Sequence, residues 1–330
     1  MNASLLMRAL RRAPKIRVFF ACGAALLAGV SPGRAHTIVG DRVFPATLTV
    51  DDPGVNDELA LPSFAYMASA NADGSPGSFN YSLGWEYSKT ITSALALYVG
   101  SGGYNWQTRP SAQGWSNLET QLKYVLWQDE KAEAIVATAV SYDWGNTGSP
   151  QSASLPSDPF STLTFKLYGG KGFGDAAADW MKPLAITGEF DARFPMVASN
   201  ADGSLNPTSV TYGATLQYSL LYMNSHVKEL PEMFRRLIPA FEAVFTTPIG
   251  NLAPNTPGQF GTNVTTGVVG PSLYYMGKYF EVGVMAQVPV NSASGAHIGL
   301  LAVVDFFLDD IAPDTLGKPL FGPALAHSHY

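Results

Sequence analysis

The stretch FNYSLGWEY at residues 79–87 alternates between apolar or aromatic side chains and polar or small ones. A second stretch, VTYGATLQYSLLY at residues 210–222, repeats this pattern. Successive side chains of a strand point to opposite faces, so a period of two places one face in an apolar medium and the other in a polar one. A helical period would instead spread the aromatic side chains around a cylinder. Both stretches therefore predict strands with one apolar face.

The same alternation recurs along most of the chain and defines twelve segments. Most of them span 10 to 14 residues, the length with which a tilted strand crosses a bilayer, whereas strands of soluble proteins average about 5–6 residues. We therefore predict an all-β fold, an antiparallel transmembrane β-barrel of about 12 strands. The expected strands are 61–70, 78–88, 91–101, 117–128, 132–144, 161–168, 184–193, 210–223, 236–247, 264–275, 279–290 and 296–308.

The connections between these segments differ at the two ends of the predicted barrel. At one end three connections are tight, at Lys89-Thr90, 129–131 and 277–278. Short periplasmic turns and longer extracellular loops are typical of outer-membrane barrels. The glycine-rich run GGKGFG at 169–174 is expected to be a flexible turn. The long connections, rich in Gly, Ser, Pro and Asn, are 102–116, 145–160, 194–209 and 248–263.

The first 35 residues have the pattern of a cleaved secretory signal peptide. A basic stretch precedes an apolar run at 18–30 that is too short to cross a bilayer. A lipoprotein site at Cys22 is the less favoured alternative. We expect the exported chain to lie in the outer membrane. The expected organisation is a signal peptide at 1–35, a periplasmic amino-terminal segment at 36–60, the barrel at 61–308 and a periplasmic tail at 309–330.

The composition excludes several classes of protein. Charged residues make up 14% of the chain, against about 25% in ordinary soluble domains. Beyond residue 35 there are 14 basic and 26 acidic residues, so the formal net charge is 14 − 26 = −12, which argues against binding to nucleic acid. The single cysteine, Cys22, lies in the leader. The rest of the chain therefore has no disulfide, zinc–thiolate site or cysteine nucleophile.

The charged residues of the predicted strands follow the polar phase of the alternation. An isolated charge that faces lipid costs about 2–4 kcal/mol near the bilayer midplane, so we expect these side chains to line the lumen. Nine are acidic and four are basic, which predicts a preference for cations or neutral molecules over anions. The candidate lumen-lining residues are Glu86, Glu119, Lys123, Glu133, Asp143, Lys166, Glu189, Asp191, Arg193, Arg236, Glu242, Glu281 and Asp305.

Motifs that carry enzyme chemistry do not occur in the sequence. There is no G-x-S-x-G elbow, phosphate loop or paired-histidine metal motif, so we expect neither an enzyme nor a cofactor. Weak metal candidates are His36, whose amine and imidazole would chelate copper(II) or nickel(II) after cleavage, and His327 and His329 near the carboxyl end. The expected partners are outer-membrane lipid, a small-molecule solute and the barrel-assembly machinery during insertion, with no nucleic acid.

Two stretches carry a resemblance to a known family. The stretch YFEVGVMAQVPV at 279–290 looks like a penultimate barrel strand, and GDRVFP at 40–45 with DDPG at 51–54 looks like the amino-terminal segment of similar exported proteins. Through these stretches, roughly the second half of the chain resembles bacterial outer-membrane channels of phenol-degradation (MetA) pathways. The resemblance implies passage of small, often hydrophobic or aromatic molecules and no catalytic residue. The tail at 309–330 departs from that family's usual ending.

The leading functional hypothesis is an outer-membrane channel that passes small molecules by passive diffusion. Two alternatives stay open. One is a plugged structural or ligand-binding or metal-binding barrel without transport, because twelve strands can be filled by side chains. The other is a soluble periplasmic β-sandwich, whose aromatic face would need a second sheet to cover it.

Overall fold

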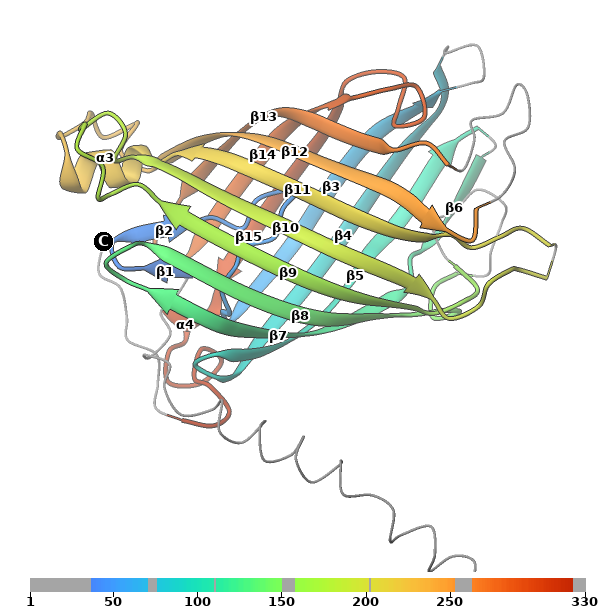
Figure 1. Ribbon diagram of the computed structural model, residues 1–330, viewed down its shortest axis with the longest axis horizontal. Helices are drawn as coiled ribbons and strands as arrows, with labels where there is room; N and C mark the ends of the chain where they lie inside the picture. The colour runs from blue at the N-terminus through green and yellow to red at the C-terminus, as the bar shows by residue number, and fades with distance from the viewer. Residues whose placement is uncertain are drawn as a thin grey trace, which may run out of the picture. The chain divides into compact units, whose positions relative to one another are not determined.

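The computed structural model describes residues 37–70, 76–109, 111–149, 158–201, 203–252 and 263–322. Among these residues, thirteen strands share one antiparallel sheet, and twelve of them close into a barrel through the pairing of β4 with β5 (Figure 1). The barrel strands are β3 (Glu58–Ala70), β4 (Pro76–Thr92), β5 (Leu95–Thr108), β7 (Leu118–Asp129), β8 (Ala134–Trp144), β9 (Thr162–Gly172), β10 (Leu184–Pro195), β11 (Thr208–Tyr218), β12 (Leu237–Gly250), β13 (Thr266–Met276), β14 (Phe280–Pro289) and β15 (Gly299–Phe307).

The predicted fold class is therefore confirmed, and the β-sandwich alternative is wrong because one sheet closes on itself. The thirteenth strand, β6 (Ser111–Trp115), pairs only with the far end of β5. The expected signal peptide and the three terminal histidines at 36, 327 and 329 lie outside the described residues.

The two faces of the wall differ as the alternation predicts. Large apolar side chains such as Phe165 and Phe241 point outward and are 50% and 51% exposed. On β7 the outward Leu122 lies between Gln121 and Lys123, both of which are buried inside. The apolar belt can thus face lipid while the polar phase lies within the barrel.

The long connection expected at 102–116 is wrong, because β5 runs to Thr108 and β6 occupies Ser111–Trp115. Three further local predictions are also wrong. The first turn lies at Ser93–Ala94 because β4 extends through residues 89–90. The glycine-rich run at 169–174 is not a flexible turn, since β9 extends to Gly172. The strand expected at 210–223 ends at Tyr218, where the side chain of Ser219 accepts a hydrogen bond from the backbone N–H of Tyr222 and caps helix α3 (Leu220–His226).

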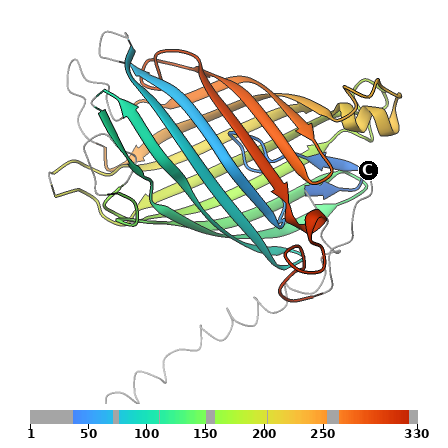
Figure 2. The ribbon, with the colours of Figure 1, turned by 180° about the vertical axis from the view of Figure 1, so that it is seen from behind.

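Residues 37–57, here called the internal segment, lie inside the barrel rather than forming the separate periplasmic segment expected at 36–60. The segment begins with the hairpin of β1 (Thr37–Val39) and β2 (Arg42–Phe44), drawn in blue within the wall in Figures 1 and 2. Its apolar side chains Ile38 and Val43 join Ile238, Tyr274, Met276 and Phe307 of the wall in a buried cluster. Burial of this apolar surface favours a position inside the lumen.

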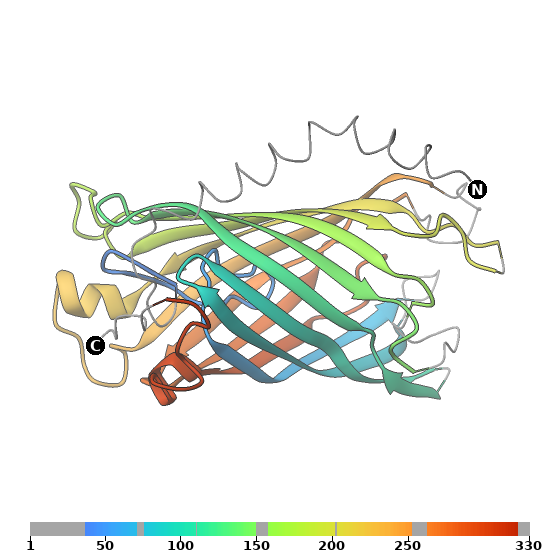
Figure 3. The same cartoon turned by 90° about the horizontal axis from the view of Figure 1, so that it is seen from below.

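Short turns and the two helices gather at one end of the barrel, here called the turn end, and the other end is called the loop end (Figure 3). After β15, helix α4 (Leu308–Ile311) begins a tail that packs against the end of β4. Lys89 Nζ donates to the carbonyls of Leu316 and Lys318, at 2.8 Å each. In the described ranges neither helix has the length and apolar character needed to span a membrane.

Candidate functional site

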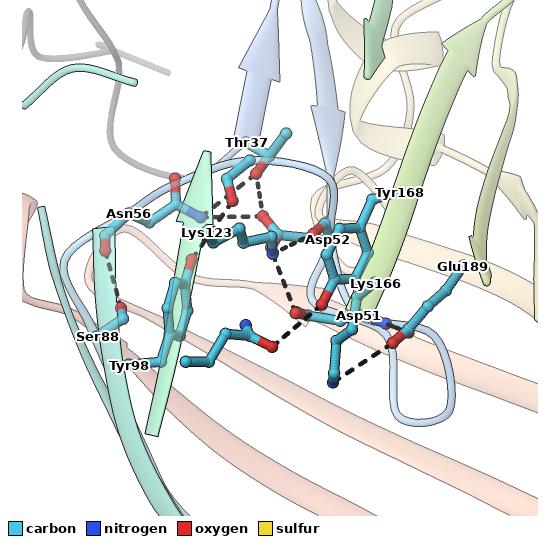
Figure 4. A network of polar contacts seen from close by, with 12 residues as sticks. Thr37, Asp51, Asp52, Asn56, Ser88, Tyr98, Lys123, Lys166, Tyr168 and Glu189 are labelled. Atoms are coloured by element: carbon cyan, nitrogen blue, oxygen red, sulfur yellow. Dashed lines mark hydrogen bonds and ion pairs between the residues drawn. The ribbon is translucent and has the colours of Figure 1, made fainter. Parts of the chain in front are cut away.

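The lumen is occupied by the internal segment, and Lys123 of β7 makes the central contact to it (Figure 4). Its Nζ lies 3.0 Å from Asp51 Oδ2 and 3.1 Å from Asp52 Oδ1, and it also donates to the carbonyl of Asp52. The Lys123 side chain is 0% exposed, with its ammonium over the rings of Tyr98 and Tyr168. A buried charge must be paired and hydrogen-bonded, and here the partners come from the internal segment.

A second group of charges lies beside this contact. Lys166 Nζ of β9 is 3.6 Å from Glu189 Oε1 and 3.7 Å from Asp191 Oδ2, both on β10. Glu189 Oε2 in turn accepts a hydrogen bond of 2.9 Å from the backbone N–H of Asp51. Burial alone would raise the pKa of the Asp51 carboxyl, but the charges of Lys123 and Lys166 outweigh it and hold the pKa below its usual value.

Glu242 of β12 holds the internal segment from the opposite direction. Its carboxylate accepts from the backbone N–H of Thr49 at 2.9 Å, from the Thr49 hydroxyl at 2.7 Å, and from the hydroxyl of Tyr274. The Tyr274 hydroxyl also accepts from the backbone N–H of Leu48 at 2.9 Å. A fully buried carboxylate with several donors is thereby compensated without a basic partner.

The hairpin of the internal segment is held at the turn end through Arg42. Its Nη2 lies 3.0 Å from Glu133 Oε2, and its Nη1 donates to the carbonyl of Pro183 at 3.1 Å. The guanidinium stacks over the ring of Tyr222 of α3, 3.9 Å from the ring centroid. Glu133 was expected in a strand, but it lies in the turn before β8 with a φ of 47°. Its carboxylate nevertheless points into the barrel.

Inner-wall glycines make room for the internal segment. A Cβ on Gly170 would lie 3.0 Å from Pro53 Cγ, and one on Gly213 would lie 2.8 Å from Val50 Cγ2. A Cβ on Gly172 would lie 2.5 Å from Arg42 Nε. These close approaches give a physical reason for glycine within strands, where it usually weakens the sheet.

A cavity of about 470 Å³ remains between the internal segment and the wall, within the usual size range of small-molecule sites. One side is formed by residues of the internal segment from Ala46 to Asp51, and the other by inner faces of β3, β4, β5, β7, β9, β10 and β15. Tyr98, whose ring lies inside the barrel beside Lys123, adds an aromatic side chain to the lining. The charged lining residues are Asp51, Glu58, Glu86, Glu119, Lys166, Glu189 and Asp305.

The structure brings most of the thirteen candidate lumen residues to the inside of the barrel. Asp143 lies near the loop end and accepts a hydrogen bond of 3.0 Å from the Asn117 side chain. Glu281 is buried opposite Asp305 in the register of β14 and β15. The remaining residues inside, placed by the contacts and the cavity above, are Glu86, Glu119, Lys123, Glu133, Lys166, Glu189, Asp191 and Glu242.

The two arginines differ from this group. Arg236 precedes β12 and donates to the carbonyl of Met276 at 3.2 Å, so it belongs to the turn end rather than to a strand. Arg193 is an exposed residue of β10 near the loop end. In the described ranges, no group of three or more His, Cys, Asp or Glu side chains is arranged to hold a metal ion.

Sequence reasoning missed the functional residues of the internal segment. Arg42, Thr49, Asp51 and Asp52 all contact charged residues of the wall, and Glu58 lines the cavity. One signal was present in the sequence. Lys123 falls in the inward phase and needs a buried counter-charge, and the acidic pair at 51–52 is the partner that only the tertiary structure identifies.

Comparisons with known proteins agree with the fold. No protein-family model and no curated protein matches the chain. A solved outer membrane channel from Pseudomonas putida F1 is 12% identical, with coverage of 80% of this chain and 99% of that chain and a TM-score of 0.50. The NanC porin is 9% identical, with coverage of 76% of this chain and 98% of that chain and a TM-score of 0.42. The KdgM porin in complex with disordered oligogalacturonate is 11% identical, with coverage of 74% of this chain and 98% of that chain and a TM-score of 0.41. The chain has the closed, porin-like barrel fold found in outer-membrane channels.

Proposed function

We propose that the protein is an outer-membrane channel through which small molecules diffuse passively. The observation that carries this proposal is the cavity of about 470 Å³, lined by charged and polar side chains inside a closed barrel whose outer surface is apolar. A sealed apolar core would not keep the carboxylates of Glu86, Glu119 and Asp305, which form no ion pair among the described residues. The leader would direct export, the barrel-assembly machinery would insert the barrel, and outer-membrane lipid would surround it.

The proposed solutes are small and often hydrophobic or aromatic. The resemblance to channels of phenol-degradation pathways supports this class, and the buried ring of Tyr98 beside the cavity is compatible with it. Passage without a chemical step is the activity we propose, so the protein would not be an enzyme.

Conductance across a planar lipid bilayer tests the proposed function. Protein extracted in detergent is first checked by circular dichroism for a strand-dominated spectrum. It is then added to the bilayer beside a control that contains detergent only. Discrete current steps that appear only with folded protein are the expected result. A folded protein that inserts and stays silent would contradict the channel hypothesis.

The second candidate function is a plugged barrel that binds a ligand without transport. The internal segment favours it, because Arg42, Lys123 and Glu242 hold that segment by buried contacts at three places. Solute uptake by proteoliposomes separates the two functions. A folded barrel that binds an aromatic solute but does not admit it to the vesicle interior would favour the plugged alternative.

A further inference from the structure

Acidic side chains occupy matched positions on neighbouring strands along one wall of the lumen. The register pairs Glu281 of β14 with Asp305 of β15, and Asp305 with a small residue, Ala60, of β3. Ala60 pairs with Glu86 of β4, which pairs with Gly100 of β5. Directly opposed residues of antiparallel strands lie on the same face with Cβ atoms about 4.5–5.5 Å apart. These positions therefore form a continuous line across five strands.

The line continues over two further strands. Gly100 pairs with Glu119 of β7, and Glu119 pairs with Asp143 of β8. We call the five acids Glu281, Asp305, Glu86, Glu119 and Asp143 the acidic row. Every charged position of this line is acidic, and the residues between the acids are Ala60 and Gly100, which are small.

The acidic row extends from one end of the barrel toward the other. Glu281 is the second residue of β14, which begins at the turn end, and Asp305 is close to the end of β15. Glu119 and Asp143 lie at the loop-end termini of β7 and β8. Strands of outer-membrane barrels tilt by about 35–45°, so a row across the strands advances along the barrel axis. Glu86 lies between the two groups and faces the cavity.

The basic side chains of the lumen do not neutralise this row. Lys123 is held by Asp51 and Asp52, and Lys166 lies between Glu189 and Asp191. In the described part of the chain, no acid of the row forms an ion pair. Arg193 acts on Asp143, and Lys166 acts on Glu86 and Glu119, through their charges without forming an ion pair.

Two carboxylates of the row also have an oxygen without any hydrogen bond. Glu281 and Asp305 are 1% and 3% exposed, and Glu281 Oε1 and Asp305 Oδ1 have no hydrogen-bond partner among the described residues. Asp305 lines the cavity together with Glu86 and Glu119. Buried carboxylates without partners are costly, and a small cation that enters from the cavity would supply the missing charge.

The small residues of the line keep its middle part open. A Cβ on Gly100 would lie 3.3 Å from Glu86 Cβ and Cγ, so the Glu86 side chain lies across this glycine. Ala60 and Gly100 both line the cavity beside Glu86. A larger side chain at either position would separate the carboxylates from one another and from the cavity.

We infer that the acidic row binds small cations and guides them along one wall of the lumen between the two ends of the barrel. The inference rests on the proposed channel function and adds a second class of solute to the small molecules proposed above, namely small inorganic or primary ammonium cations. Each carboxylate attracts the cation in turn. The acids are directly opposed in the pairs Glu281–Asp305 and Glu119–Asp143, and one small residue separates each pair from Glu86. Anions are repelled along the same wall.

The test compares the full-length protein with Glu86→Gln/Glu119→Gln, which keeps side-chain size and removes two charges of the row. The matched control is Asp175→Asn/Glu232→Gln, which removes two charges from exposed residues of the turn end. Reversal potentials in a gradient of KCl, and then of methylammonium chloride, give the permeability of each cation relative to chloride. We expect the row variant to lower this ratio about fivefold for each carboxylate within about 4 Å of the ion in water. The control should match the wild type.

A conducting row variant with the wild-type permeability ratio would overturn the inference and leave the channel function intact. If no protein conducts, the proposed function fails, and the melting temperature then tests the row alone. Cation binding to the folded state raises the melting temperature, so the wild type should melt higher in KCl than in N-methylglucamine chloride of equal ionic strength. The row variant should lose this difference. Equal melting of the wild type in both salts would overturn the inference.

Discussion

Replacement of Lys123 by Met tests how the internal segment is held in the lumen. The substitution keeps an unbranched, apolar side chain beneath the segment but removes the ammonium that lies 3.0 Å from Asp51 and 3.1 Å from Asp52. The two carboxylates would then face a buried wall position without their counter-charge. We expect the internal segment to leave its binding position more often, and the conductance to rise.

The magnitude follows from the burial of this contact. Removal of one partner from a buried ion pair costs about 3–5 kcal/mol, because the remaining charge is left uncompensated. At about 1.4 kcal/mol for each factor of ten, the population of the detached segment should rise by about two to four powers of ten. Complete detachment also requires the contacts of Arg42 and Glu242 to break, and the substitution leaves these unchanged, so the same factor applies to the population of the fully detached segment.

Single-channel recording and limited proteolysis measure this change. Arg42 is fully buried in the hairpin, so trypsin should cut after it only when the segment leaves the lumen, and mass spectrometry detects that cut. Lys182→Met removes a half-buried lysine whose Nζ is paired with Asp179 at the turn end, and it is the matched control. Lys123→Met with Asp51→Asn and Asp52→Asn should restore part of the protection. Unchanged conductance together with unchanged protection of Arg42 in Lys123→Met would refute the reasoning.

Three further predictions follow from other contacts. The double substitution Glu189→Gln and Asp191→Asn leaves Lys166 without its two ion-pair partners. Reversal potentials should then show a weaker preference for cations over anions. This effect should shrink at high salt, because the Debye length falls from about 10 Å at 0.1 M to about 3 Å at 1 M. Gly213→Val places a Cβ where it would lie 2.8 Å from the Val50 side chain of the internal segment. Thermal unfolding should show that the free energy of unfolding falls by about 1–3 kcal/mol. An unchanged melting temperature would argue against this contact. Burial and two neighbouring carboxylates raise the pKa of Asp309 to about 8, so docking of the tail should be strongest below about pH 4 and should be lost as the pH rises through about 8. Hydrogen exchange of residues 308–322 at pH 6 and pH 9 measures this, and Asp309→Asn should abolish the difference.

The strands of this protein are determined by local sequence. A period of two is visible within a few residues, and lipid on one side and a polar lumen on the other leave only one acceptable phase for a charged strand. All twelve barrel strands could therefore be located, with errors confined to their ends. The error at 219–223 has a local cause, because the cap at Ser219 stops the strand although the apolar alternation continues.

The contents of the lumen were decided by the tertiary structure. Lys123 meets Asp51 across 72 residues, and Thr49 meets Glu242 across 193, so no local pattern at 36–60 reveals where that segment lies. Glycine at 170 and 172 suggests a turn until the internal segment is seen to pack against both positions. The acidic row depends in the same way on register across seven strands. The alternation assigns each acid to the inner face, but only strand pairing sets its height along the barrel and thus which charges become neighbours.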